Sequence, residues 1–163
     1  MNVRRSIAAA VVVLAVPALS SCGVSFGAQT DQVYNPSVGV DDRSGDVDVL
    51  NALIVSGTNG SGTVVATLVD NDQQNADTLK GVAGAGADAS ATVKVTGDTT
   101  IPAGGVLNLA DGSGISIRGK RVVPGNFVTL TFSFDRAEAI TLGVPVVSAS
   151  NPDYAGVKVP PAS

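Results

Sequence analysis

The stretch FVTLTFSF, residues Phe127–Phe134, decides the fold class of this chain. Its apolar residues alternate with hydroxyl-bearing residues at a period of two, which is the pattern of a β-strand that buries one face. The buried face is expected to carry Val128, Leu130, Phe132 and Phe134, and the opposite face Thr129, Thr131 and Ser133. The stretch therefore predicts a strand whose apolar side is covered by a second layer.

Further strand-like segments flank this stretch, separated by turns rich in glycine, asparagine and aspartate. The expected strands are Asp46–Ser56, Thr63–Asp70, Thr92–Thr96, Val106–Leu109, Ile115–Arg118 and Ala137–Val147. The first two predict an antiparallel hairpin that supplies Leu53, Val55 and Val65 to the facing layer, and the fourth and fifth predict another hairpin. Residues 71–81 are expected to form a loop, and the glycine-rich residues 81–91 a turn. This spacing predicts an all-β, Ig-like two-sheet β-sandwich over residues 46–148.

The first 22 residues are typical of a bacterial lipoprotein signal peptide. Arg4 and Arg5 form a positive segment, and Ile7–Leu19 form an apolar run too short to cross a bilayer core of about 30 Å. Small residues precede Cys22, the only cysteine, as in a lipobox whose thiol receives a diacylglyceryl group. We therefore expect cleavage after residue 21 and a lipid anchor at Cys22, which would hold the protein on the extracytoplasmic face of the cell membrane.

Processing of this kind sets the organisation of the mature chain. Residues 22–45 have no sustained period and are expected to form a tether, and the polar, proline-containing residues 149–163 are expected to form a disordered tail. Removal of Arg4 and Arg5 leaves eight basic against fourteen acidic residues, a net charge of −6. This excess of negative charge argues against nucleic acid and anionic lipid as electrostatic partners.

Two segments partly match known ligand-binding loops. Asp70–Asp72 opens like a calcium loop, but Asn75 and Gly81 stand where such a loop needs a glycine and a glutamate. Residues 84–89 (GAGADA) fit the loose dinucleotide pattern G-x-G-x-x-A, yet they lead into an expected strand, so no helix N-terminus is predicted there to hold a pyrophosphate. A solvated loop and a glycine turn are the preferred interpretations.

Charged side chains form two clusters along the chain. The acidic one comprises Asp41, Asp42, Asp46 and Asp48, and the basic one comprises Arg118, Lys120 and Arg121. The acidic cluster could bind cations weakly, but a soluble strand entry that resists edge pairing is preferred. For the basic cluster an exposed hairpin end is preferred, with binding of an anionic envelope glycan or an acidic partner as the alternative.

The composition also limits the chemistry that is available. The chain has no histidine, which excludes Ser-His and Cys-His nucleophile systems, and it contains no G-x-S-x-G motif. We therefore expect a non-enzymatic protein without catalytic, cofactor-binding or metal-binding residues. A carboxylate-dependent hydrolase stays open as a third alternative.

The segment Ile101–Val147 resembles the end of the PCuAC family of periplasmic copper chaperones. Pro124-Gly125, Thr129–Phe132 (TLTF) and Val144–Val146 (VPV) match late turn and strand elements of that family, and looser similarity extends the resemblance over roughly residues 46–147. Together with the lipobox and the tether, the chain is similar to the LpqE-type lipoproteins of actinobacteria. The resemblance implies a cupredoxin-like β-sandwich.

The resemblance also implies a copper site, and here the sequence departs from the family. PCuAC domains bind Cu(I) through His and Met side chains, which are the soft ligands that this ion prefers. The single methionine of this chain is Met1, and Gly114, Ile115, Ser116 and Ile117 stand on the strand where the ligands would lie. We expect a lost copper site and a non-enzymatic binding or structural role in the cell envelope, with an envelope protein or glycan as partner. The alternative is a carrier of a metal or small ligand that uses carboxylate or backbone groups.

Overall fold

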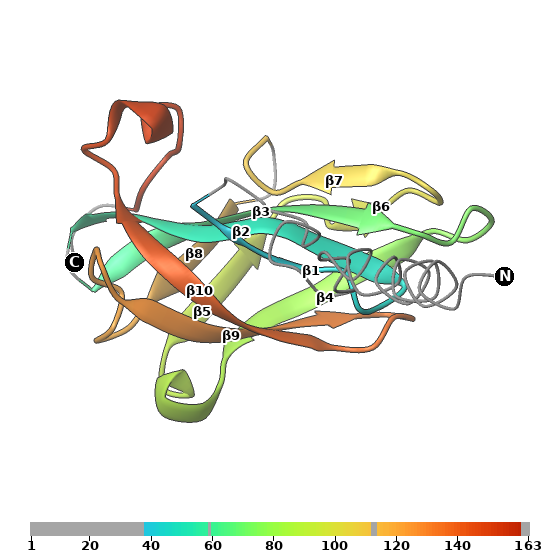
Figure 1. The fold of residues 1–163 in the computed structure, drawn as a ribbon, viewed down its shortest axis with the longest axis horizontal. Coiled ribbons are helices and arrows are strands. Elements are labelled where there is room, and N and C mark those ends of the chain that lie inside the picture. Colours follow the sequence, from blue (N-terminus) through green and yellow to red (C-terminus); the bar gives the residue numbers. More distant parts are fainter. Residues whose placement is uncertain (1–37, 59, 112–113, 161–163) are drawn as a thin grey trace, which may run out of the picture. The chain divides into compact units, whose positions relative to one another are not determined.

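Ten β-strands build the part of the chain that the computed structural model describes, residues 38–58, 60–111 and 114–160 (Figure 1). The strands are β1 (Val40–Asp42), β2 (Val47–Thr58), β3 (Ser61–Asp70), β4 (Asp77–Gly84), β5 (Thr92–Thr96), β6 (Thr100–Ile101), β7 (Val106–Asn108), β8 (Gly114–Arg118), β9 (Phe127–Phe134) and β10 (Ile140–Ser148). These described residues include no α-helix, only the single 3₁₀ turns Gly86–Asp88 and Pro152–Tyr154. No helix long and apolar enough to cross a membrane occurs among them.

The strands form one strongly curled sheet with the order β5-β8-β3-β2-β10-β9-β4-β6, and β1 and β7 pair at the sides of β2 and β3. All pairs are antiparallel except β10 with β2. Curling brings β4, near one end of this order, against β5 at the other end. The result is two facing layers, which confirms the predicted all-β sandwich.

Strand β10 connects the two layers. Its first part, from Ile140 to Pro145, pairs with β9, whereas its last part, from Val146 to Ser148, pairs in parallel with β2. In Figure 1 this strand runs obliquely from beside β9 toward β2. Because proline has no N–H to donate, Pro145 suits the point at which the strand leaves its first partner.

The core lies between the two layers. The predicted stripe of β9 is buried as expected, with Val128, Leu130 and Phe132 almost inaccessible and Phe134 8% exposed. The facing residues of β2 and β3 in the core cluster are Val47, Val49, Ala52, Ile54, Val64, Ala66 and Leu68. The predicted contributors Leu53, Val55 and Val65 are not in this cluster, so the parity predicted for the hairpin was wrong.

A bulge in β2 explains the error for Leu53 and Val55, whereas Val65 lies on β3, where Val64, Ala66 and Leu68 alternate into the core without a bulge. Leu50 pairs with Thr67 and Leu53 with Val65, so two residues of β2 stand opposite one residue of β3. The first of the two, Asn51, has a positive φ of 50°. One extra residue moves every later side chain to the other face of the sheet. Ala52 and Ile54 therefore point into the core, and Leu53 and Val55 are buried on the opposite side.

Two further expectations about strands were wrong. The predicted second hairpin does not form, because β7 and β8 both pair with β3, β7 at Thr67–Val69 and β8 at Ser61–Val64. The predicted loop over residues 71–81 ends early, since β4 begins at Asp77 and continues to Gly84. Both differences arise because the strands pair with partners distant in sequence, which no local pattern reports.

The two ends of the domain also differ from the expected boundaries. Within the expected tether, Val40–Asp42 already form β1, which pairs with β2. Within the expected disordered tail, Pro152–Tyr154 form a 3₁₀ turn, and the carbonyl of Lys158 accepts a 2.7 Å hydrogen bond from Thr63 Oγ1. The C-terminal segment therefore folds back across the outer side of β3.

Candidate functional site

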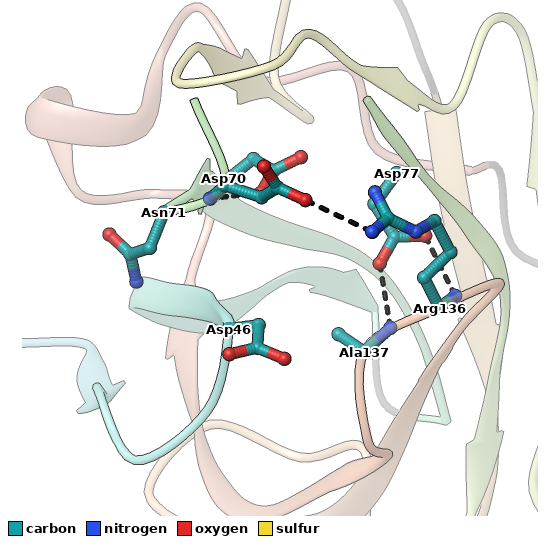
Figure 2. A pocket seen from close by; sticks show the side chains of 7 residues that line it. Asp46, Asp70, Asn71, Asp77, Arg136 and Ala137 are labelled. Carbon is teal, nitrogen blue, oxygen red and sulfur yellow. Dashed lines mark hydrogen bonds and ion pairs between the residues drawn. The ribbon is translucent and has the colours of Figure 1, made fainter. Parts of the chain in front are cut away.

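An acidic pocket lies where the end of β3, the start of β4 and the β9–β10 turn meet (Figure 2). Its cavity has a volume of about 330 Å³, and the lining residues are Asp46, Asp70, Asn71, Asp72, Asp77, Arg136 and Ala137. Four carboxylates thus share the pocket with one guanidinium group. The charge of the lining favours a positively charged ligand.

Asp77 is the structural anchor of this pocket. Its buried carboxylate accepts the backbone N–H groups of Thr78, Asp135 and Arg136 on Oδ1 and that of Ala137 on Oδ2, at 2.6 to 3.1 Å. Burial raises the pKa of Asp77, but these four donors outweigh it, so the pKa lies below its ordinary value. A carboxylate with four donors is already satisfied, which leaves Asp77 little capacity for a ligand.

Asp72 is also engaged by its neighbours. Its carboxylate accepts the N–H of Gln74 at 2.9 Å and the side-chain amide of Asn75 at 3.0 Å, and it pairs with the Arg136 guanidinium at 3.0 Å. The backbone N–H of Gln74, followed by the Asn75 amide and Arg136, holds the pKa of Asp72 well below its usual range. Asp72 therefore closes the loop between β3 and β4 and fixes Arg136 at the pocket.

Asp70 is the most buried of the four carboxylates that line the pocket. It is 2% exposed, and its Oδ1 accepts the N–H of Asp72 at 2.8 Å. Its Oδ2 is buried and has no hydrogen-bond partner among the described residues. The exposed Asp46 lies across the pocket and is held there because its carbonyl accepts the N–H of Asn71 at 2.9 Å. No three His, Cys, Asp or Glu side chains of the described part converge into a ready-made metal cluster.

A second hollow lies on the outer side of β3 and β8, beneath the C-terminal segment. Two adjoining cavities of about 200 and 230 Å³ share Thr63, Gly114 and Lys158 as lining residues. Thr96 and Ser116 add two more hydroxyl groups to the second cavity, and Val159 and Pro160 complete its wall. We name these two cavities the hydroxyl groove, because their side-chain donors and acceptors are mainly hydroxyl groups.

The hydroxyl groove adjoins the residues for which the resemblance implied copper ligands. Ile115 also lines the second cavity, but Ile115 and Ile117 are fully buried and belong to the core cluster, so their side chains face the core. Gly114 and Ser116 lie on the groove side of β8. Neither a glycine nor a serine hydroxyl is a soft ligand for Cu(I).

The four residues of the predicted acidic cluster have different hydrogen-bond partners, and the Arg43 guanidinium joins two of them, at 3.8 Å from Asp41 and 3.7 Å from Asp48. Asp41 Oδ1 accepts the N–H of Asn51 at 2.6 Å, Asp42 Oδ1 accepts the N–H of Ser44 at 2.9 Å, and Asp48 Oδ1 accepts the Asn71 side-chain amide at 2.9 Å. The hydroxyl and the N–H of Ser44 lower the pKa of Asp42. These three carboxylates stabilise the strand entry, and Asp46 alone of the four lines the pocket.

The basic cluster is divided as well. The Arg121 guanidinium donates to the carbonyl of Phe127 at 3.0 Å and pairs with the buried Asp88 at 3.5 Å. The other oxygen of Asp88 accepts the N–H of Thr129 at 2.9 Å. Arg121 therefore holds the loop before β9, and Arg118 and Lys120 remain exposed. The exposure of Arg118 and Lys120 agrees with the exposed end that was preferred, and binding of an anionic glycan or an acidic partner stays a prediction.

Two other sequence predictions concern segments away from these sites. Cys22, the predicted lipidation residue, lies outside the described residues. Residues 84–89, which fit the dinucleotide pattern, form the end of β4 and the 3₁₀ turn Gly86–Asp88. That turn leads to β5 and provides no helix N-terminus for a phosphate group.

Asp77 and Arg136 are the pocket residues that the sequence interpretation missed. Three of the four donors that surround Asp77 lie 58 to 60 residues further along the chain, and Arg136 meets Asp72 across a separation of 64 residues. Such pairs leave no local spacing signal. The segment DTLKGVAG does not alternate either, because a register shift between Leu79 and Gly81 interrupts β4.

Comparison with known proteins gives a fold relationship. No family model and no curated protein matches the chain. Among solved structures, the copper-bound PCuAC domain from PmoF2 is similar, with a TM-score of 0.55 and 16% identity over 67% of this chain and 98% of that domain. The apo PCuAC domain from PmoF1 gives a TM-score of 0.56 and 15% identity, over 67% of this chain and 99% of that domain. At these identities the likeness concerns the fold, and this chain has a PCuAC-like β fold.

Proposed function

We propose that this protein is a lipid-anchored, extracytoplasmic binding domain of the cell envelope, related to the LpqE-type lipoproteins of actinobacteria, that has lost its copper site. The observation that carries the proposal is the composition of β8 on a PCuAC-like fold. Gly114 and Ser116 face the hydroxyl groove, Ile115 and Ile117 face the core, and the chain contains no histidine. Strand β8 of this PCuAC-like fold therefore offers Cu(I) no soft ligand.

The role is proposed to be non-enzymatic. The chain has no histidine base, and the buried carboxylate of Asp77 in the acidic pocket has both oxygens occupied by backbone donors. A pair of carboxylates for hydrolysis needs one group that is free to take a proton and one that activates water. Asp77 and Asp72 have depressed pKa values, which is the opposite of what a general acid needs.

The hydroxyl groove is the surface that we assign to binding. Ser116 offers a hydroxyl group, and Thr63 and Thr96 offer hydroxyl oxygens, since their O–H groups donate to the carbonyls of Lys158 and Gly114. The exposed Asp111 and Lys158 add one charge of each sign. Hydroxyl and backbone groups suit an uncharged polar partner, such as an envelope glycan or an extended protein segment. A carrier of a small polar ligand in the same groove is the second candidate.

Copper competition tests the loss of the metal site. The purified protein is mixed with Cu(I) and a strong Cu(I) chelator, with the PmoF2 PCuAC domain as the positive control. The expected result is that the chelator removes all Cu(I) from this protein while the control domain retains it. A one-to-one complex that survives the chelator would refute the loss of copper binding.

Crosslinking in native membranes tests the groove. A photoreactive residue is placed at the exposed Thr96, beside the groove, and in a second variant at the exposed Asp135, beside β4. We expect a discrete adduct from position 96 and none from position 135. Equal adducts from both positions, or none from position 96, would contradict a binding role for the groove.

A further inference from the structure

The basic residues of the described part of the chain divide into two groups. Four of them pair with carboxylates, namely Arg43, Lys80, Arg121 and Arg136. The others are exposed and form no ion pair with any described residue, namely Lys94, Arg118, Lys120 and Lys158. Acidic residues outnumber basic ones in this protein, so carboxylates are not in short supply. The four cations lack partners because of where the fold places them.

Two of the unpaired cations lie on the outer side of the β5–β8 pair. The isoleucines of β8 belong to the core cluster, so Ser116 and Arg118 point outward. On β5, Thr92 pairs with Arg118 and Lys94 pairs with Ser116, and residues paired across antiparallel strands share a face. Each cation therefore stands opposite a hydroxyl residue, and Lys94 and Arg118 are diagonal neighbours with Cα atoms about 7–8 Å apart. We name this outer side of β5 and β8 the cationic face.

No carboxylate lies on the cationic face. The paired segments Thr92–Thr96 and Gly114–Arg118 contain no aspartate or glutamate. Asp98 and Asp111 lie in turns beyond the Gly114 end of the face. Asp98 accepts the N–H of Thr100 at 3.0 Å, and Asp111 accepts the side-chain amide of Asn108 at 2.9 Å. The charge of the face is therefore positive although the protein as a whole is acidic.

The other two unpaired cations border the cationic face. Lys120 lies two residues after the end of β8 and lines a hollow of about 190 Å³ there. Lys158 lines the hydroxyl groove at the other end, and its carbonyl meets Thr63, the residue of β3 that pairs with Ser116. The face, about 14 Å long for strands of this length, thus runs between two hollows that each hold a cation.

Protection of a sheet edge explains only part of this arrangement. Strand β5 is the last in the sheet order, and a lysine in the middle of an edge strand hinders pairing with another chain. This accounts for Lys94. It does not account for Arg118, because β8 lies between β5 and β3 and has no free edge there. Two neighbouring like charges repel each other, and a bound anion would offset that repulsion.

We propose that the cationic face is a docking surface for an anionic polysaccharide. Arg118 and Lys94 bind its acidic groups, and the hydroxyl groups of Thr92 and Ser116 hydrogen-bond to its sugar hydroxyls. The guanidinium and ammonium groups suit carboxylate and phosphate oxygens, and a serine or threonine hydroxyl both donates and accepts. The alternation of cations and hydroxyl groups on the face therefore matches a polymer that carries both kinds of group.

Two other anionic partners fit this face less well. A protein segment is usually anchored by apolar or aromatic side chains in pockets, and the outward residues of the two strands include no apolar side chain. A bilayer is an extended surface, so it would also approach acidic residues around the face to within a Debye length of about 8 Å. A single polysaccharide chain contacts the positive strip alone.

The proposal goes beyond the role proposed for the hydroxyl groove and does not depend on it. Neither Lys94 nor Arg118 lines the groove. Substitution of these two residues therefore leaves the groove lining unchanged, and the crosslinking test at Thr96 reports on the groove separately.

The test is calorimetric titration of the full chain, purified in a neutral detergent, with carboxymethyl dextran in 50 mM and 500 mM NaCl. Unmodified dextran of equal length is the control, because it differs only in lacking the carboxylates. Carboxymethyl dextran is expected to bind in 50 mM NaCl and at least fivefold more weakly in 500 mM NaCl, since salt screens exposed charges. Unmodified dextran is expected to bind at least tenfold more weakly than carboxymethyl dextran in 50 mM NaCl.

The double variant Lys94→Gln/Arg118→Gln removes both cations of the face. Since one exposed ionic contact contributes a few-fold to affinity, the pair is expected to account for a loss of about tenfold. The matched control Arg43→Gln/Lys80→Gln removes the same charge from two residues that pair with carboxylates elsewhere, and it is expected to change the affinity less than twofold. Thermal unfolding checks that each variant folds. If the first variant does not, Lys94→Gln alone is expected to lose about threefold.

Three results would overturn the proposal. The first is equal binding of carboxymethyl dextran and dextran, or binding of neither. The second is an equal loss of affinity in the control variant, which would mean an effect of net charge alone. The third is tighter binding of poly-L-glutamate than of carboxymethyl dextran at equal carboxylate concentration, which would indicate an acidic protein segment as the partner.

Discussion

Asp77 Oδ2 accepts a 2.8 Å hydrogen bond from the backbone N–H of Ala137, sixty residues further along the chain. Figure 2 shows the bond at the wall of the acidic pocket. Because Asp77 begins β4 and Ala137 lies in the turn between β9 and β10, this contact fixes the turn to the start of the neighbouring strand. The same carboxylate accepts three more N–H groups, so one side chain satisfies the donors of a whole turn.

The first prediction removes the charge of this anchor. Asp77→Asn keeps one carbonyl oxygen but directs an NH₂ group at one of the backbone donors, which leaves donors unsatisfied. Such a loss at a buried site costs about 1–3 kcal/mol in the free energy of unfolding. Urea denaturation of the wild type and the variant at pH 7 measures the difference, and a change below about 0.5 kcal/mol would show that Asp77 does not hold the turn.

The second prediction concerns acid stability. The pKa of Asp77 is lower in the folded protein than its ordinary value of 3.8, because the four N–H donors outweigh burial. Its contribution is therefore fully present above pH 3.8 and is lost as the pH falls through the lower, folded pKa. Below about pH 4 the wild type should lose stability more steeply than Asp77→Asn, and parallel curves from pH 6 to pH 2 would contradict this assignment.

The comparison of sequence and structure shows which features local patterns report. The buried stripe of β9 was predicted correctly, because strict alternation of apolar and polar residues indicates which side chains face the core. The buried face of the first hairpin was predicted wrongly. On β2 the extra residue at Asn51 reverses every later position, and on β3 the adjacent Val64 and Val65 give no clear alternation. The pairing of β7 and β8 with β3 was also missed, since turn signals between two strands do not exclude separate partners.

The acidic pocket could be predicted only in part. Asp70 and Asp72 were noticed as the opening of a calcium-like loop, and the departures at Asn75 and Gly81 correctly exclude that loop type. What the sequence could not report is the burial of Asp70 Oδ2 or the arrival of Arg136 from the β9–β10 turn. Both depend on pairs of strands that are far apart in the chain.

The third prediction compares two glycines of β4. A methyl group on Gly84 would lie 2.0 Å from the carbonyl oxygen of Asp88, because the 3₁₀ turn folds back onto this position. Gly84→Ala must displace backbone and is expected to cost about 1–3 kcal/mol. Gly81→Ala on the same strand meets nothing within 4 Å and is expected to be neutral or to stabilise by up to about 1 kcal/mol. Thermal unfolding of both variants measures the two changes in stability. Equal changes in Tm would contradict the close packing of the 3₁₀ turn against Gly84.

The fourth prediction concerns the anchor. A diacylglyceryl group provides two acyl chains and therefore stable membrane attachment, whereas a single chain would bind only marginally. Cys22→Ala is expected to yield unprocessed or released protein, and Cys22→Ser serves as a second variant that lacks the thiol. Fractionation of cells with detection of the protein and its size is the measurement. A variant of mature size that stays with the membrane would show that Cys22 is not the lipidated residue.

The last prediction tests the two-layer core through neighbouring residues of β9. Phe132 is completely buried and lies opposite Ile140 and Val82, so Phe132→Ala should cost about 3–5 kcal/mol. Thr131 points to the other face, where its hydroxyl meets that of Thr141 at 2.9 Å near solvent, and Thr131→Ala should cost less than half as much. Chemical denaturation of both variants gives the comparison. Equal losses would mean that both faces of β9 are packed to the same extent, which is incompatible with one buried face.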